Sequence, residues 1–209
     1  MKFNTVELFC GTKSFSKVAK ERGHNTFTVD IDESFNPDLV KDILELQRDD
    51  LPKKIDILWA SPPCTTFSVA SLRHYWVNGK PKNLKTWVGM CYILKTIQLI
   101  EEIESDNPNL IWFIENPRGM LRKQRFMKDF HRKTVTYCQY GDFRQKPTDI
   151  WTNFIYWTPK AMCKPGAPCH QSAKRGSDRG TQYISGSKKR AIIPEALFYE
   201  IYEELRSVK

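Results

Sequence analysis

The chain has 209 residues, of which 40% are hydrophobic, and it carries a formal net charge of +9 and six cysteines. This length suits a single α/β domain with its own hydrophobic core. The composition excludes a membrane span, because no stretch approaches ~18 consecutive apolar residues. It also excludes a small disulfide-built secreted domain, because the cysteines are scattered, and the first residues contain no signal-peptide pattern. We therefore expect a protein of a reducing, cytoplasmic setting.

The positive charge is concentrated in the second half of the chain. Residues 1–115 contain 14 Lys and Arg against 16 Asp and Glu, whereas residues 116–209 contain 19 against 8. A basic half beside a nearly neutral half indicates one face suited to a polyanion. A solvated basic surface without any partner would show the same balance.

Short apolar strands alternate with helix-length segments over the first 115 residues, which is typical of a doubly wound, mostly parallel α/β sheet. A helix over 15–22 is expected to end at Gly23, a good C-terminal cap. A longer helix is expected over 84–103, and its apolar spacing allows one buried side made of Trp87, Cys91, Leu94, Ile97 and Ile103. The expected strands of this half are 5–9, 25–29, 39–43, 55–60 and 109–114.

Later segments differ in character. Residues 65–85 are polar, basic and aromatic and predict a long loop. Residues 134–138 and 150–156 predict two further strands, close enough in sequence to pair antiparallel at the sheet edge.

Beyond the last expected strand, Pro, Gly, Ser, Lys and Arg dominate and apolar periodicity disappears until a closing helix over 194–205. We expect three parts: a core (1–157), a short basic insert (158–190) and a closing segment that packs back on the core (191–209).

Three candidate cofactor positions follow the first strands. In an open parallel sheet, ligands bind beyond the carboxyl ends of the strands, where the strand order reverses. Gly11 lets the backbone approach a ligand, Asp30 can accept hydrogen bonds from ribose hydroxyls, and Asp42 can reach an adenine amino group. Each residue alone is equally consistent with a plain turn or a helix cap. The G-x-G-x-x-G pattern of dinucleotide sites is absent, which favours a nucleoside cofactor without a pyrophosphate.

The strongest chemical signal is Ser61-Pro62-Pro63-Cys64, directly after an apolar strand. The two prolines stiffen the backbone that presents the cysteine. A thiolate at this place can add to carbon 6 of a cytosine, which makes carbon 5 nucleophilic toward a sulfonium methyl group. Glu115, in Glu115-Asn116-Pro117 at the end of a nearby strand, can hydrogen-bond ring N3 and the exocyclic amine when it is protonated.

In their order along the chain, these motifs are similar to those of the cytosine-5 DNA methyltransferase family, especially its small phage-type members. The similarity covers roughly residues 3–156 and the closing helix. Pro-Pro-Cys alone would be a weak signal, but its pairing with Glu-Asn-Pro makes it specific, and a buried structural thiol is the competing interpretation of Cys64. The matching stretches are Leu8-Phe9-Cys10-Gly11, Val29-Asp30, Asp42-Ile43, Pro62-Pro63-Cys64-Thr65-Thr66-Phe67-Ser68 and Glu115-Asn116-Pro117.

The resemblance implies the fold of S-adenosylmethionine-dependent methyltransferases, with S-adenosylmethionine as cofactor and double-stranded DNA as partner. It implies methylation of cytosine carbon 5 through a covalent Cys64 adduct, with the base flipped out of the duplex and Glu115 binding it. The loop after Cys64 resembles the family's mobile DNA-closing loop and offers Arg73, Lys80 and Lys82. The family's cofactor positions fall on Phe9, Gly11, Asp30, Ile31, Asp42, Ile43 and Pro62.

Three departures from the family pattern stand out. The glycine-rich first turn is Gly11-Thr12-Lys13-Ser14, and the glutamine usual after the catalytic cysteine is Thr65. The family's Gln-x-Arg-x-Arg stretch is matched only loosely, with Arg144 in the glutamine place and Lys146 and Thr148 in the arginine places. Arg144 and Lys146 are both candidates to steady the cytosine carbonyl oxygen.

The basic insert replaces the family's large target-recognition region with about 30 residues. Its Lys174, Arg175 and Arg179 are expected to contact DNA phosphates, which carry little sequence information.

The insert also contains Cys163, Cys169 and His170, which can form part of a zinc site. Because no fourth ligand is obvious and the spacing is not that of a standard finger, we favour a Pro/Gly loop with packed cysteines and no metal.

Two other functions are compatible with the sequence. The same motifs would serve methylation of cytosine in RNA. The altered arginine positions would also fit a catalytically silent nucleic-acid-binding module. In either case the resemblance to phage-type proteins suggests a bacterial or phage-infected host cytoplasm.

Overall fold

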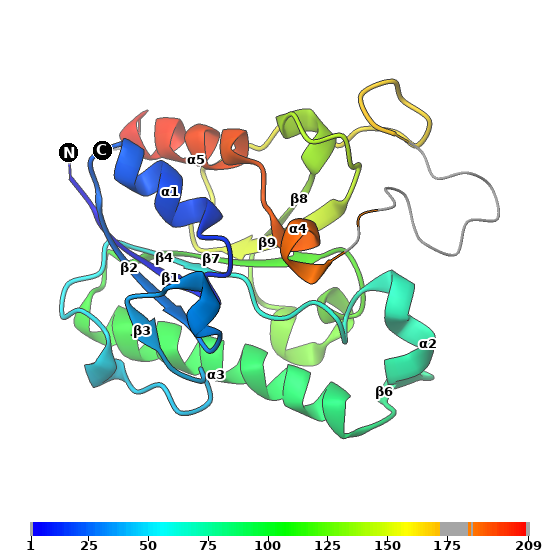
Figure 1. Ribbon diagram of the computed structural model, residues 1–209, viewed down its shortest axis with the longest axis horizontal. Coiled ribbons are helices and arrows are strands. Elements are labelled where there is room, and N and C mark those ends of the chain that lie inside the picture. The colour runs from blue at the N-terminus through cyan, green and yellow to red at the C-terminus, as the bar shows by residue number, and fades with distance from the viewer. Residues whose placement is uncertain (1, 172–183, 185, 208–209) are drawn as a thin grey trace.

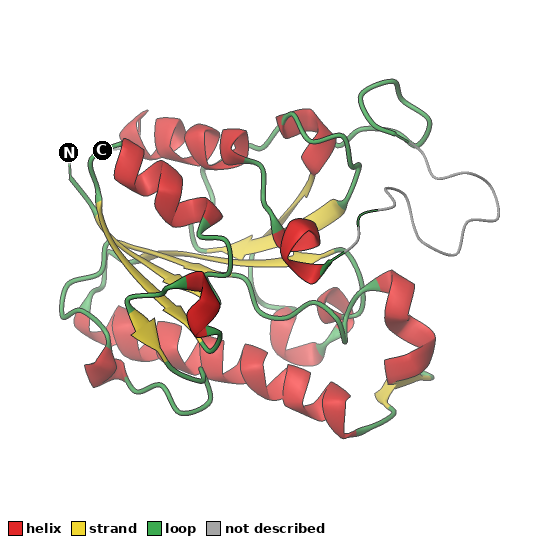
Figure 2. Ribbon diagram, viewed as in Figure 1, coloured by secondary structure: helices red, strands yellow, loops and turns green. Residues whose placement is uncertain are grey.

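A computed structural model describes residues 2–171, 184 and 186–207 of the chain (Figure 1). A central sheet is covered by helices on both faces (Figure 2). The strands of that sheet are β1 (Asn4–Leu8), β2 (Asn25–Asp30), β3 (Leu39–Val40), β4 (Ile57–Ala60), β7 (Ile111–Pro117), β8 (Arg132–Thr136) and β9 (Pro147–Thr152).

The sheet has the order β3-β2-β1-β4-β7-β9-β8. β1 pairs in parallel with both β2 and β4, and β4 pairs in parallel with β7. β9 runs antiparallel to both of its neighbours, β7 and β8. The predicted doubly wound, mostly parallel sheet with an antiparallel pair at its edge is therefore confirmed. The strand order reverses between β1 and β4, which is where such sheets bind ligands.

Helices α1 (Ser14–Glu21) and α5 (Glu195–Ser207) cover one face of the sheet, and α3 (Leu84–Asp106) covers the other (Figures 1 and 2). Phe15 of α1 stacks on Trp59 of β4, with ring centroids 5.7 Å apart, and meets Phe198 of α5 edge-on at 5.5 Å. Aromatic packing of this kind adds to the burial of apolar surface, and it holds the closing helix on the core.

The exposed side of α3 differs from the expectation. Ile97 and Ile103 are buried, but Trp87 and Leu94 are 53% and 45% exposed and Cys91 is also exposed. Apolar side chains occur all around this helix, so periodicity alone does not select one face. The side that packs on the sheet instead carries Gly89, Ile93, Ile97, Ile100 and Ile103.

Residues 65–85 do not form a single loop as expected. They contain α2 (Leu72–Tyr75) and a small hairpin of β5 (Trp76–Val77) and β6 (Lys80–Pro81). Trp76 is the anchor: it is 4% exposed, donates its indole N–H to the Thr66 carbonyl at 2.6 Å and packs on Phe67. A buried tryptophan with a satisfied N–H gives a polar segment a fixed place on the core.

The remaining elements are short. Helix α4 (Ser187–Ala191) precedes the closing helix. Over the described ranges, no helix has both the length and the apolar composition needed to cross a membrane. The 3-10 turns are η1 (Glu33–Phe35), η2 (Arg48–Asp50), η3 (Val69–Ser71), η4 (Leu121–Lys123), η5 (Arg125–Met127) and η6 (Tyr137–Tyr140).

Candidate active site

The turn after β1 has an unusual backbone. Phe9, Gly11 and Lys13 have φ angles of 55°, 44° and 56°. Positive φ is free of cost only for glycine, and strained residues of this kind are concentrated at ligand-binding turns. The Phe9 ring packs edge-on against Tyr92 of α3, with centroids 5.8 Å apart. The turn is thus held against α3 at the carboxyl edge of the sheet.

Asp30, the last residue of β2, connects this turn to the next strand. Its two carboxylate oxygens accept the backbone N–H groups of Gly11, at 2.8 Å, and Asp32, at 2.9 Å. A carboxylate oxygen accepts two hydrogen bonds, so each oxygen retains room for a further donor such as a ribose hydroxyl. The next side chain, Ile31, is 63% exposed and offers an apolar surface beside the carboxylate.

Asp42 and Ile43 play different parts in this region. The Asp42 carboxylate accepts the Leu44 N–H at 2.9 Å. Its charge also acts on Tyr92, because burial and then the Asp42 carboxylate raise the pKa of that phenol. Ile43 is 2% exposed and belongs to the core, so its side chain is not free to contact a ligand. Only its backbone remains a candidate for the cofactor contact expected from the sequence.

A shallow groove lies beside these residues, between the segment after β4 and the start of α3. Its volume is about 220 Å³. Gly89 allows the close approach of these two segments, because a Cβ there would lie 2.3 Å from the Thr66 hydroxyl. The groove is lined by Pro63, Thr65, Thr66, Leu84, Lys85, Val88, Gly89 and Tyr92.

The segment that carries Cys64 is fixed from both sides. Pro62 is buried, and its carbonyl accepts the Asn116 side-chain amide of β7 at 3.1 Å. On the other side, the Cys64 carbonyl accepts the N–H groups of Phe67 and Ser68 at 3.0 and 2.9 Å. Cys64 is therefore presented in a tight turn between two neighbouring parallel strands.

Gly119, just beyond β7, completes this frame. The Phe67 carbonyl lies only 2.1 Å from where a Cβ of Gly119 would stand, and it accepts the N–H of Met120 at 2.8 Å. Only glycine permits this approach. The segments after β4 and β7 are thereby locked together at the carboxyl edge.

Glu115 lies on β7, beside the Cys64 segment, and is 5% exposed. The Tyr137 hydroxyl donates to its Oε1 at 2.8 Å. Because Oε1 accepts this bond, Oε2 is the oxygen left for a further partner. Tyr137 is fully buried, and burial together with Glu115 raises its pKa far above the usual range, so it remains a donor. The sequence analysis did not identify Tyr137; its place in an expected edge strand was the only signal.

The surroundings of Cys64 have opposing effects on the pKa of its thiol. Burial is the largest influence and raises the pKa of the thiol, Glu115 raises it further, and the ammonium of Lys146 lowers it. Lys146 also lies over the Tyr137 ring at 4.6 Å. Cys64, Glu115 and Lys146 therefore form one electrostatically connected group.

Arg144 does not share that position. The residue is 4% exposed, and its guanidinium forms a bidentate ion pair with Asp142 and donates to the carbonyls of Arg190 and Ile192 at 2.9 and 2.8 Å. These contacts use most of its five donors and attach the segment before α5 to the sheet edge. Thr148, in the other arginine place, is fully buried and donates to the Lys146 carbonyl at 3.0 Å.

The expected DNA-contacting residues fall into two groups. Arg73, Lys80 and Lys82 are exposed on the α2–β6 segment, which follows the Cys64 turn. Lys174, Arg175 and Arg179 lie outside the described residues.

Cys163, Cys169 and His170 lie together beside η6.

Comparisons with known proteins agree with this geometry. Residues 3–137 match the family model described as C-5 cytosine-specific DNA methylase. A probable DNA (cytosine-5)-methyltransferase of Frog virus 3 (isolate Goorha) is 28% identical over 163 residues, which cover 74% of this chain and 72% of that protein.

Two solved structures share the fold at low identity. The Entamoeba histolytica methyltransferase EhMeth gives a TM-score of 0.52 at 14% identity, covering 78% of this chain and 57% of that one. The S. pombe Dnmt2 methyltransferase gives a TM-score of 0.50 at 14% identity, covering 72% of this chain and 50% of that one. The chain thus spans about half the length of these structures.

Proposed function

The chain belongs to the C-5 cytosine-specific DNA methylase family, and from this premise we propose that it transfers a methyl group from S-adenosylmethionine to carbon 5 of cytosine in double-stranded DNA. The observation that carries the proposal is the pairing of Cys64 with Glu115. A cysteine presented after Pro-Pro at the end of β4 lies within the electrostatic influence of a buried carboxyl group on β7, and Asn116 ties the two segments together.

In this proposal Cys64 is the nucleophile. Its thiolate forms a bond to carbon 6, and the electron pair of the 5,6 double bond moves to make carbon 5 nucleophilic. The bound cofactor supplies an electrophilic methyl group. After transfer, a water molecule takes the proton from carbon 5, its electron pair re-forms the 5,6 double bond, and the Cys64–carbon 6 bond breaks to release the thiolate. Carbon 6 is inaccessible inside a stacked duplex, so the target base must be flipped out.

Glu115 and Lys146 assist the addition. The free Oε2 of Glu115 can donate to ring N3 when protonated and Oε1 can accept from the exocyclic amine. Lys146 favours the thiolate form of Cys64 and is our candidate for the contact with the cytosine carbonyl oxygen. Arg144 is proposed to be a structural residue, since its donors are engaged by Asp142 and by backbone carbonyls.

The residues at the β1–β4 reversal fit a nucleoside cofactor. The Asp30 carboxylate retains two acceptor positions, Ile31 offers an exposed apolar surface, and the turn at Gly11 brings backbone to the same place. We propose that Phe9, Asp42, Ile43 (by its backbone) and Pro62 complete the site.

Replacing Asp30 with alanine is expected to weaken S-adenosylmethionine binding more than tenfold. Losing charge-assisted hydrogen bonds costs about 1.5–3 kcal/mol. Isothermal calorimetry measures the affinity. Because Asp30 also accepts the Gly11 N–H, the melting temperature of each variant must be recorded, with Glu45→Ala, an exposed acid, as control. An unchanged affinity in the folded Asp30→Ala protein would move the cofactor site elsewhere.

DNA is proposed to lie along the edge that presents Cys64. The exposed Arg73, Lys80 and Lys82 follow the Cys64 turn, and they can contact phosphates. The charge of the 158–190 insert, including Lys174, Arg175 and Arg179, supports further phosphate contacts.

Covalent trapping tests the function directly. A duplex with 5-fluorocytosine at the target position should form a stable adduct with the protein in the presence of S-adenosylmethionine, because fluorine cannot leave carbon 5 as a proton does. Denaturing electrophoresis and peptide mapping should place the adduct on Cys64. Trapping on the matching RNA alone would show an RNA methyltransferase. A salt-sensitive gel shift without any adduct would show a catalytically silent binding module.

A further inference from the structure

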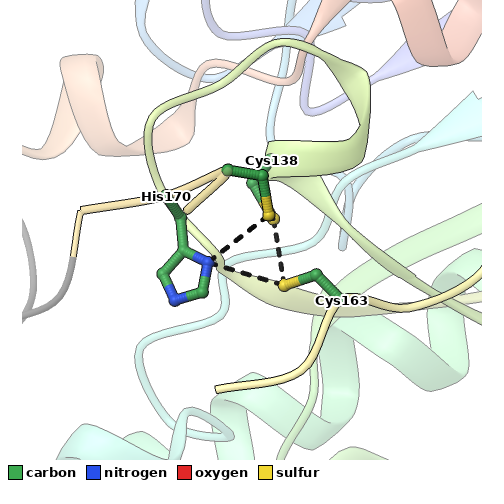
Figure 3. Close-up of side chains that lie close together, drawn as sticks. Cys138, Cys163 and His170 are labelled. Atoms are coloured by element: carbon green, nitrogen blue, oxygen red, sulfur yellow. Dashed lines mark hydrogen bonds between the residues drawn. The ribbon is translucent and has the colours of Figure 1, made fainter. Parts of the chain in front are cut away.

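We propose that Cys138, Cys163, Cys169 and His170 form a structural zinc site that fastens the start of the basic insert to the edge of the sheet. The four potential ligand atoms all lie within 4.8 Å of one another. Figure 3 shows the Cys163 thiol and the His170 ring pointing toward one another and toward Cys138. Cys138, on η6, is the fourth ligand that sequence spacing did not reveal, because it lies 25 residues before Cys163.

Three of the distances between these atoms are close to those that tetrahedral zinc requires. With Zn–S bonds of about 2.3 Å and a Zn–N bond of about 2.0–2.1 Å, two sulfur ligands lie about 3.8 Å apart and a sulfur lies about 3.5 Å from the ring nitrogen. The Cys138 and Cys169 sulfurs are 3.7 Å apart, and His170 Nδ1 is 3.6 and 3.7 Å from the sulfurs of Cys163 and Cys169. Only the Cys138–Cys163 pair, at 3.1 Å, is closer.

A disulfide explains these positions less well. All six cysteines are free, and the 3.1 Å between the Cys138 and Cys163 sulfurs is well beyond the ~2.05 Å of a disulfide bond. A disulfide between these two would also leave unexplained why the Cys169 sulfur and the His170 imidazole face the same centre. Three sulfurs and one imidazole nitrogen around a common centre match a closed Cys₃His site.

Polar groups around the cluster suit thiolate ligands. The Gln145 side-chain amide donates to the Cys163 sulfur at 3.2 Å, and that of Gln139 donates to the Cys169 sulfur at 3.5 Å. Such donors orient metal-bound sulfur and disperse its charge. Binding of Zn²⁺ by three thiols and a neutral imidazole releases three protons, so no other reactant is needed.

The backbone of the insert already follows the sheet edge on both sides of the cluster. The Cys163 N–H donates to the Thr136 hydroxyl at 3.0 Å, and the Gln171 N–H donates to the Phe143 carbonyl at 2.9 Å. Between them, Gly166, with φ of 82°, allows the chain to turn back. Zinc would hold the backbone at these two hydrogen bonds in place, next to η6, which also carries Tyr137.

Metal content tests the site without any reference to methyl transfer. Protein purified under reducing conditions from zinc-supplemented cells should contain about one zinc per chain by plasma mass spectrometry. Cys163→Ser, Cys169→Ser and His170→Gln should each lower the content at least tenfold. Cys91→Ser, which removes an exposed cysteine of α3, should leave it unchanged.

Two further measurements use the intact chain. Cobalt(II) added to chelator-stripped protein should give the intense visible absorption of tetrahedral thiolate coordination, and His170→Gln, at a partly exposed position that leaves the core intact, should lose it. Chelation should also speed tryptic cleavage after the exposed Lys160, three residues before Cys163. Equal zinc content in wild type and ligand variants would overturn the proposal, and so would a Cys138–Cys163 disulfide in the protein as purified.

Discussion

Replacing Cys64 with serine is expected to lower the rate of methyl transfer by on the order of 10³-fold or more, while cofactor affinity stays nearly unchanged. A serine hydroxyl is a far weaker nucleophile than a thiolate, and in the proposed mechanism the addition to carbon 6 precedes transfer. The cofactor contacts that we propose come from other residues, chiefly Asp30 at the end of β2. Transfer of a tritium-labelled methyl group to DNA, with calorimetry of S-adenosylmethionine binding, measures both quantities.

The matched control for this variant is Cys91→Ser, an exposed cysteine on α3, which should transfer at the wild-type rate. Near-normal transfer by Cys64→Ser would rule out covalent catalysis through Cys64, whatever the affinity of the variant for the cofactor.

Because burial raises the pKa of Cys64 and Lys146 opposes that effect, Lys146→Met should shift the rise of the transfer rate with pH to higher pH.

The strand pattern of the sheet could be predicted from local sequence because each strand is a short apolar run bounded by breakers. β1, β2, β4 and β7 lie within a few residues of the expected ranges, and the residues proposed to act at their ends follow from that. The side of α3 that is buried could not be predicted, since Trp87 and Leu94 are as apolar as Ile97. Only the position of the helix on the sheet decides between them.

Contacts between segments that are distant in sequence could not be predicted either, because they too depend on how the elements pack. Tyr137 reaches Glu115 across 22 residues, and Cys138 reaches Cys163 across 25. Both pairs depend on β8 and β9 folding back beside β7, which no spacing rule expresses. The choice between Arg144 and Lys146 also required the fold, because the ion pair with Asp142 and the carbonyls before α5 engage Arg144.

Replacing Glu115 with glutamine is expected to lower the rate of methyl transfer by about 10²–10⁴-fold, the usual contribution of a positioned acid. The amide keeps a donor and an acceptor near the base, but it cannot pass a proton to ring N3 as Cys64 adds to carbon 6. Single-turnover transfer measures the loss, and filter binding should show nearly unchanged affinity for DNA.

Tyr137→Phe separates this chemical role from simple positioning. Losing the hydroxyl that donates to Oε1 at 2.8 Å frees the carboxyl group to rotate, so we expect a smaller loss, about tenfold, in the same single-turnover rate. The double variant Glu115→Gln/Tyr137→Phe should be little worse than Glu115→Gln alone, because the hydroxyl acts through the carboxyl group that the first substitution has already removed. Fully additive losses would show that Tyr137 contributes independently of Glu115. A Glu115→Gln variant that transfers at the wild-type rate would require a different acid to face ring N3.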